Sequence, residues 1–119
     1  FGLLNKLKSG IALEYTHYDF KRGRPLLVHH GLMGNQKNFR SLVQNDHISR
    51  HCDSFLIDCR NHGKSARTES HTVPEMAADL YEFIKKVVVP RYPSRRVSLM
   101  GHSMGGRVIM ASTILFPEL

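Results

Sequence analysis

One short motif carries the residues for nucleophilic chemistry: Gly101-His102-Ser103-Met104-Gly105-Gly106. The spacing Gly101-x-Ser103-x-Gly105 is typical of a serine held on a sharp turn between a strand and a helix. Such a turn lifts the hydroxyl clear of the sheet and leaves no room for side chains at the flanking glycines. Ser103 is therefore the candidate nucleophile, and His102 is expected to point away from the reacting atom. The alternative is a glycine-rich turn capped by Ser103.

A second motif, His30-Gly31-Leu32-Met33-Gly34, could stabilise the charge that such a nucleophile creates. Attack on an acyl carbonyl builds an oxyanion, which two backbone N–H groups usually stabilise. One of them is expected from Met104, directly after the serine, and the other from a loop that follows an earlier strand. In this loop the N–H of Leu32 is the first choice and that of Met33 the second. A plain strand-to-helix turn is the alternative.

The third motif is the polar segment from Asp58 to Ser65. Its central residues, Asn61-His62-Gly63, suit a tight turn with positive φ. Asp58 and Arg60 are expected to pair and hold that turn, which makes the segment structural. A role for His62 as a substitute catalytic base is the minor alternative.

Strands and helices alternate along the chain, and this order positions the three motifs. Strands are expected at 11–20, 26–30, 54–58 and 97–100, and helices at 38–45, from Thr72 to Pro90, and at 107–116. The order predicts an α/β fold with a mostly parallel, doubly wound sheet covered on both faces. Ligands of such sheets bind beyond the carboxyl ends of the strands. All three motifs follow expected strands, so we expect them to meet at that edge.

The expected helices carry recognisable signals. Thr72 and Glu75 form a capping box, with Pro74 in the first turn and Pro90 and Pro93 at the end. The 38–45 helix is expected to bury an apolar stripe made of Phe39, Leu42 and Val43. The 107–116 helix is apolar around most of its circumference, which predicts a buried helix.

Charge and composition exclude several classes of protein. The net charge is +7, but the basic residues are spread out and no aromatic platform accompanies them, so no nucleic-acid partner is expected. Apolar runs are too short for a membrane span, which needs about 20 residues. No metal is expected, because His29 and His30 should point to opposite faces of a strand and no HExxH pattern exists. Cys52 and Cys59 are expected to be free thiols in a reducing compartment.

In this order, the motifs at residues 30–34, 58–65 and 101–106 resemble those of the α/β-hydrolase superfamily. The Arg-Asn-His-Gly turn resembles small acyl esterases, a group that includes bacterial carboxylesterases with thioesterase activity and a mitochondrial α/β-hydrolase-domain protein of animals. The resemblance covers residues 14–119 and leaves residues 1–13 as an expected N-terminal extension. It implies the N-terminal half of an eight-stranded fold, without the cap and the last strands.

By position, the resemblance makes Ser103 the nucleophile and Leu32 and Met104 the oxyanion-hole residues. The supporting residues are His30, Gly31, Gly101, His102 and Gly105. His29 departs from the family pattern, which usually has an apolar residue there, and this predicts a less buried position or a weaker strand.

The resemblance implies a serine hydrolase that cleaves small carboxylic esters or thioesters through an acyl-enzyme, with no cofactor or metal. It also implies an intracellular location, mitochondrial by resemblance alone.

A triad needs an acid and a histidine after the serine, but the 16 residues after Ser103 contain no histidine and only one acid, Glu118. The chain is therefore expected to be a fragment with little turnover of its own and with an open edge on its last strand.

Two other functions remain open, and a third is disfavoured. A coenzyme A thioesterase or acyltransferase would share the serine turn, and an inactive truncated product or binding module would fit the missing histidine. Enzymes of this fold with a carboxylate nucleophile are disfavoured because position 103 is serine.

Overall fold

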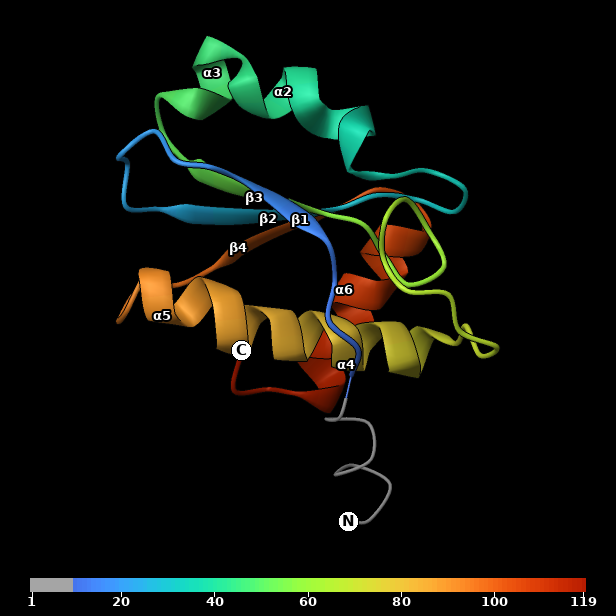
Figure 1. Ribbon diagram of the computed structural model, residues 1–119. Helices are drawn as coiled ribbons and strands as arrows, with labels where there is room; N and C mark the ends of the chain where they lie inside the picture. Colours follow the sequence, from blue (N-terminus) through green and yellow to red (C-terminus); the bar gives the residue numbers. More distant parts are fainter. Residues whose placement is uncertain (1–9) are drawn as a thin grey trace.

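The computed structural model describes residues 10–119, and within them the centre of the molecule is a four-stranded sheet (Figure 1). Its strands are β1 (Tyr15–Tyr18), β2 (Pro25–His29), β3 (Asp53–Ile57) and β4 (Ser98–Gly101), in the spatial order β1-β3-β2-β4. β2 pairs in parallel with β3 and with β4, whereas β1 runs antiparallel to β3. The mostly parallel sheet predicted from the order of elements is confirmed.

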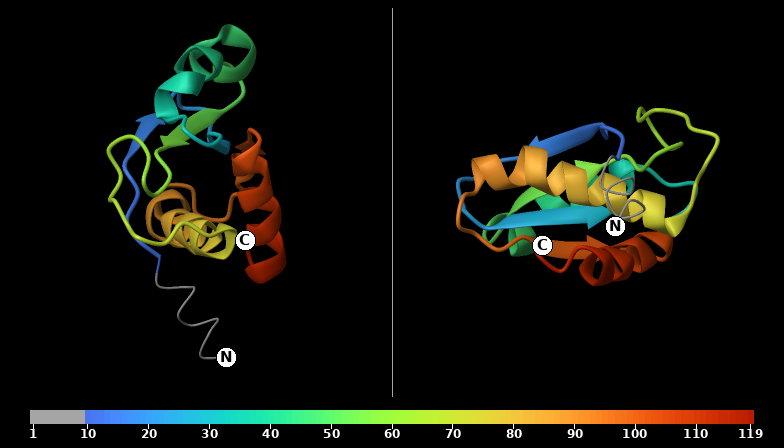
Figure 2. Two further views of the ribbon diagram at one scale, coloured as in Figure 1. Left: turned by 90° about the vertical axis from the view of Figure 1, so that its right-hand side faces the viewer. Right: turned by 90° about the horizontal axis from the view of Figure 1, so that it is seen from below.

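Helices cover both faces of this sheet, as the two views of Figure 2 show. One face carries η1 (Gln36–Phe39), α2 (Arg40–Gln44) and α3 (Asp46–Ser49). The other face carries α4 (Val73–Phe83), η2 (Ile84–Val88), α5 (Val89–Arg91) and α6 (Met104–Leu115). The doubly wound arrangement is thus also confirmed.

The strands β2 and β3 are buried along their whole length. Because successive strand residues point to opposite faces, Leu27, Phe55 and Ile57 pack in the cluster that includes residues of α4 and α6. Leu26, Val28 and Leu56 pack in a second cluster with Val43 of α2. This two-sided core explains why both strands read as unbroken apolar runs.

The helix that begins after Thr72 follows its predicted capping signal. The Thr72 side chain accepts a hydrogen bond from the backbone N–H of Glu75, with Pro74 in the first turn. The helical residues end at Arg91, between Pro90 and Pro93, the two prolines that were expected to end the helix. A π-helical turn, η2, precedes Pro90; it widens the helix where proline offers no N–H.

The first strand is shorter than predicted, since only residues 15–18 of the expected 11–20 join the sheet. The residues before it bond elsewhere: Ile11 N–H donates to Asp79 in α4, and Glu14 N–H donates to the Ser65 hydroxyl. Of the expected extension 1–13, residues 1–9 lie outside the described part of the chain.

Two expectations about helix burial are wrong. In α2, Val43 is fully buried but its neighbour Leu42 is 42% exposed, because adjacent helical residues point in different directions. In α6, Val108 and Ser112 are buried, whereas Ile114 is 77% exposed. Helix α6 packs against α4 and the sheet along one side only, and no described residue covers the opposite side.

Among the described residues β4 pairs with β2 alone, so it forms an edge of the sheet, as expected. No helix within residues 10–119 has the length and apolar character needed to cross a bilayer.

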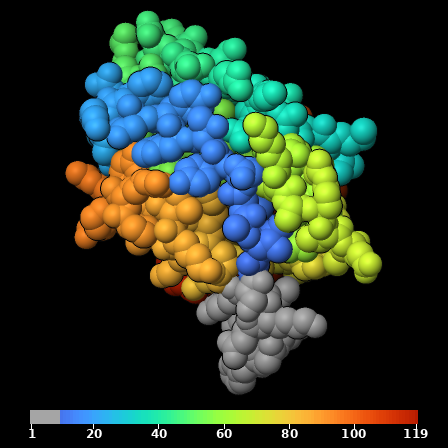
Figure 3. Space-filling view, viewed as in Figure 1, coloured from blue at the N-terminus to red at the C-terminus, as the bar shows by residue number. Residues whose placement is uncertain are grey.

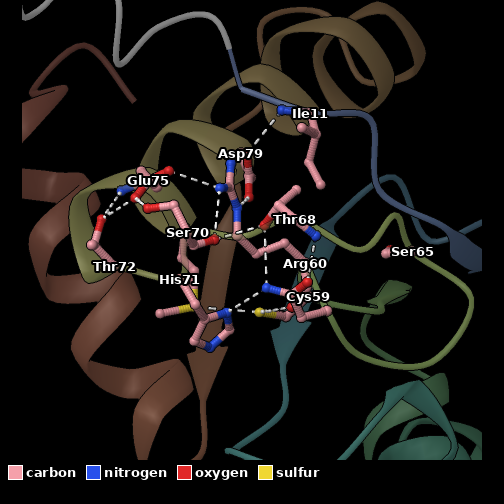
Figure 4. A network of polar contacts seen from close by, with 12 residues as sticks. Ile11, Cys59, Arg60, Ser65, Thr68, Ser70, His71, Thr72, Glu75 and Asp79 are labelled. Carbon is pink, nitrogen blue, oxygen red and sulfur yellow. Dashed lines mark hydrogen bonds and ion pairs between the residues drawn. The ribbon is translucent and has the colours of Figure 1, made fainter.

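A buried ion pair fastens the loop after β3 to helix α4 (Figure 4). The Arg60 guanidinium donates to both carboxylate oxygens of Asp79, at 2.7 and 2.9 Å, and to Glu75 at 2.9 Å. Hydrogen bonds from Arg60 to Asp79 raise the pKa of the guanidinium above its ordinary value. The predicted Asp58–Arg60 pair is therefore wrong. The Arg60 guanidinium instead makes its bidentate contact with the Asp79 carboxylate, which lies in α4.

We predict that Asp79→Asn destabilises the fold by about 3 kcal/mol, because it leaves the buried Arg60 without its main counter-charge. Urea unfolding measures this change. The matched control is Glu82→Gln, which breaks the Glu82–Lys86 pair within the same helical segment; because the Lys86 side chain is exposed, this loss should cost less than about 0.5 kcal/mol. Equal losses in the two variants would contradict an anchoring role for Asp79.

Candidate active site

Three loops meet at the carboxyl edge of the parallel strands, as predicted. The N–H of His102 donates to the carbonyl of His29 at 3.1 Å, which joins the loop after β4 to the end of β2. The N–H of Cys59 donates to His30 Nε2 at 3.0 Å, and that of Met33 donates to His62 Nε2 at 2.9 Å. In Figure 3 the loop after β3 lies at the surface beside the segment that follows β2.

The turn that carries Ser103 has the strain that its spacing predicts. Ser103 has φ 54° and ψ −113°, between β4 and the first residue of α6. A Cβ added to Gly105 would lie 2.3 Å from the carbonyl oxygen of His29, and one added to Gly101 would lie 2.5 Å from the Gly105 backbone. Both glycines are thus required by the close approach of β4, β2 and α6.

His29 lies against this turn at Gly105. It is only 2% exposed, and its Nδ1 contacts the His30 carbonyl oxygen at 2.8 Å. Burial lowers the pKa of His29 to about 4, so its ring is neutral at physiological pH. The expectation of a less buried residue is wrong, because a neutral imidazole with a hydrogen-bond partner fits an interior position.

A cleft of about 420 Å³ opens beside the exposed Ser103. Its walls come from the 30–34 motif, from η1 and from the 101–106 motif: Gly31, Leu32, Met33, Gly34, Asn38, Phe39, His102 and Ser103. The ring of His102 lies against Gly31, whose added Cβ would be 3.0 Å from His102 Nδ1. The cleft therefore brings together the serine and the loop that sequence patterns had singled out separately.

A larger hollow of about 640 Å³ lies at the opposite, amino edge of the strands, beside Asp53 and Tyr92. Its lining holds no serine, threonine or cysteine. We place the candidate site in the smaller cleft, because parallel sheets bind ligands at the carboxyl edge and Ser103 lies there.

The hydrogen bonds of the 31–34 turn distinguish the two candidate donors of that loop. Within residues 10–119 the Met33 N–H donates to His62, whereas the N–H groups of Leu32 and Met104 have no acceptor. Leu32 and Met104 are thus the available donors beside Ser103.

The 58–65 segment forms the predicted turn, with positive φ at Asn61 and Gly63. The Asp58 carboxylate accepts backbone N–H groups from Gln36 and Lys64. Burial alone would raise the pKa of Asp58, but these hydrogen bonds outweigh it and the pKa is lowered. The Asp58 carboxylate thus ties the loop after β3 to η1, which follows the loop after β2.

Sequence spacing did not reveal one cluster of potential metal ligands, in which atoms of Cys59, His62 and His71 lie within 4.8 Å of one another. As arranged, His62 has no free lone pair: its Nε2 accepts the Met33 N–H, so its Nδ1 carries the proton and donates to the Arg60 carbonyl. Burial also raises the pKa of the Cys59 thiol to about 12. In this state the cluster therefore does not offer three ligands.

The fold and this site can now be compared with known proteins. A family model described as the alpha/beta hydrolase fold matches residues 24–119. The chain therefore belongs to the alpha/beta hydrolase family.

Two sequence relatives and one solved structure illustrate the similarity. The chain is 36% identical over 95 residues to the "Probable alcohol acetyltransferase" of Saccharomyces cerevisiae, covering 80% of the chain and 27% of that protein. It is 33% identical over 110 residues to the "sn-1-specific diacylglycerol lipase ABHD11" of Xenopus tropicalis, covering 92% of the chain and 33% of that protein. A structure titled "Marine microorganism esterase" aligns with TM-score 0.77 and 34% identity, over 91% of the chain and 38% of that structure.

The chain thus spans about a quarter to two fifths of the length of these proteins. The esterases and lipases among its relatives support a hydrolase family.

We predict that Gly105→Ala destabilises the protein by about 3 kcal/mol, because the new methyl group would overlap the His29 carbonyl. Gly106→Ala is the matched control, since the nearest atom to its added Cβ is 3.6 Å away and alanine favours helix. Thermal unfolding should show a clear loss for the first variant and no loss for the second. Equal tolerance of both substitutions would contradict the close approach.

The lowered pKa of His29 also predicts a dependence of stability on pH. The unfolded chain binds a proton on this residue near pH 6.5 and the folded chain only near pH 4, so stability falls as pH decreases through that range, by roughly 3 kcal/mol. Urea unfolding between pH 7 and pH 4 measures the slope. His29→Leu should flatten it, and an unchanged slope would contradict the assignment.

Proposed function

We propose that Ser103 is the nucleophile of a serine hydrolase that cleaves carboxylic esters or thioesters in two steps. The observation that carries this proposal is the backbone of Ser103, whose φ of 54° lies on a strand-to-helix turn with glycines at both flanks. This backbone geometry supports the assignment of a nucleophile elbow. The exposed hydroxyl beside a cleft leaves room for an acyl group.

In the first step the Ser103 hydroxyl oxygen attacks the carbonyl carbon and the substrate's alcohol or thiol leaves. In the second step water attacks the acyl-serine and releases the acid. The free N–H groups of Leu32 and Met104 form the proposed oxyanion hole. Helix α6 begins at Met104, so its amino end also favours the developing negative charge.

A general base must take the Ser103 proton. Of the neighbouring histidines, His29, His30 and His62 are buried, and each has a hydrogen-bond partner on at least one ring nitrogen. His102 lines the cleft, but it is the residue directly before Ser103 and its ring lies against Gly31. These histidines do not suit this role. We therefore propose that residues 10–119 supply the nucleophile and the oxyanion donors but not the base, and that this segment alone turns over slowly. Losing a triad base costs on the order of 10⁴- to 10⁶-fold in kcat.

An acyltransferase is the second candidate, because the Saccharomyces cerevisiae relative is named an alcohol acetyltransferase. Both reactions share the acyl-serine and differ in whether water or an alcohol releases the acyl group. Gas chromatography of reactions with an acetyl thioester and ethanol separates them. Free acetate as the main product supports the hydrolase, and ethyl acetate as the main product favours the transferase.

We predict that Ser103→Ala, made in the full-length protein that contains this chain, lowers hydrolysis of short-chain nitrophenyl esters by at least 10³-fold. The matched control, Ser98→Ala at the other, exposed end of β4, should keep wild-type activity. Hydrolysis that survives Ser103→Ala would overturn the assignment of the nucleophile.

A further inference from the structure

The 31–34 segment is a turn whose conformation does not suit its sequence. The Gly34 N–H donates to the Gly31 carbonyl at 3.0 Å, and Met33 has φ 64° while Leu32 has negative φ. These features define a type II turn, in which the third residue is normally glycine or asparagine. Methionine at this position is strained, so something outside the turn must hold it.

The side chain that holds it is His62. Its Nε2 accepts the Met33 N–H at 2.9 Å, and its Nδ1 donates to the Arg60 carbonyl at 2.9 Å. His62 is 9% exposed, so this contact is shielded from water. The Met33 side chain, by contrast, is 90% exposed and contributes little packing.

The residues on either side of His62 are themselves bound to buried groups. The Arg60 guanidinium is bound to Asp79 of α4, and the Cys59 N–H is bound to His30. The position of the His62 ring is therefore set by buried groups on both sides. The turn is tied to helix α4 through a short series of hydrogen bonds.

We infer that His62 is a positioning residue for the reaction: by binding the Met33 N–H it holds the 31–34 turn in its type II form and so keeps Leu32, whose N–H we propose for the oxyanion hole, in one position. This inference rests on the proposed function. Without the contact, the turn can relax to type I, where Met33 has negative φ. The peptide between Leu32 and Met33 then rotates, so that the Met33 N–H turns away from residue 62 and the Leu32 carbonyl oxygen turns toward it. The Leu32 N–H belongs to the preceding peptide and does not flip, but the backbone that carries it is no longer fixed.

The loss should appear in the chemical step, because an oxyanion donor contributes more to the transition state than to the bound substrate. We expect His62→Leu in the full-length protein to lower kcat by on the order of 10- to 100-fold and to change KM by less than about threefold. His62→Gln should retain most activity, since its amide oxygen can accept the Met33 N–H. His71→Leu is the matched control, because it removes a neighbouring imidazole that contacts Asn61 and does not bond to the 31–34 turn.

A second substitution tests the mechanism itself. Glycine adopts positive φ without strain, so Met33→Gly added to His62→Leu should restore kcat to within a few-fold of wild type. A merely structural role of His62 would not be repaired at Met33. A double variant as slow as His62→Leu, or equal losses in His62→Leu and His71→Leu, would overturn the inference.

Where His62→Leu fails to fold, His62→Asn replaces it, because its amide stays near the position of Nδ1 and places no acceptor at Nε2. Hydrogen exchange of the Met33 amide then gives a readout that needs no activity. We expect exchange at least about tenfold faster in His62→Asn than in wild type, and equal protection would overturn the anchor. If Ser103→Ala hydrolyses esters as fast as wild type, the proposed function fails while the exchange result still decides the anchor.

Discussion

The close approach of three backbones at Ser103 is the constraint on which the site depends. The carbonyl of His29, at the end of β2, lies against Gly105 in the first turn of α6, and Gly101 lies against the same turn from β4. Only glycine fits at these two contacts. Between these two glycines the chain passes from strand to helix, and Ser103 takes a positive φ there. The exposed hydroxyl is a consequence of this crowding.

The loops around the serine are held by neutral polar groups more than by charge pairs. Burial lowers the pKa of both His29 and His30, so these rings serve as hydrogen-bond partners at neutral pH. His30 accepts the Cys59 N–H and His62 accepts the Met33 N–H, which joins the loop after β2 to the loop after β3 twice. Two buried charged groups, Arg60 and Asp58, fasten these loops to α4 and to η1. These contacts hold two of the loops beside Ser103 in fixed positions relative to each other.

Local patterns were sufficient to predict the order of elements, the cap at Thr72 and the meeting of three loops at one edge, since these follow from periodicity, turn residues and parallel pairing. Contacts between distant residues were not predictable. Nothing near Arg60 in the sequence indicates that its partner is Asp79, and nothing near Met33 indicates that its N–H is bound by His62. The burial of His29 was missed because histidine is a polar residue type, whereas the His30 carbonyl gives the buried ring a hydrogen-bond partner. The positions of Ser103, Leu32 and Met104 agree with the roles we propose for them.

In the proposed mechanism Ser103 forms the covalent acyl intermediate. Peptide mass spectrometry of the full-length protein after reaction with a fluorophosphonate tests this role. We expect one modified residue, Ser103, in the peptide that joins β4 to α6, with no adduct after prior acylation by a slowly released ester. An adduct on another residue, with Ser103 unmodified in an active preparation, would contradict it.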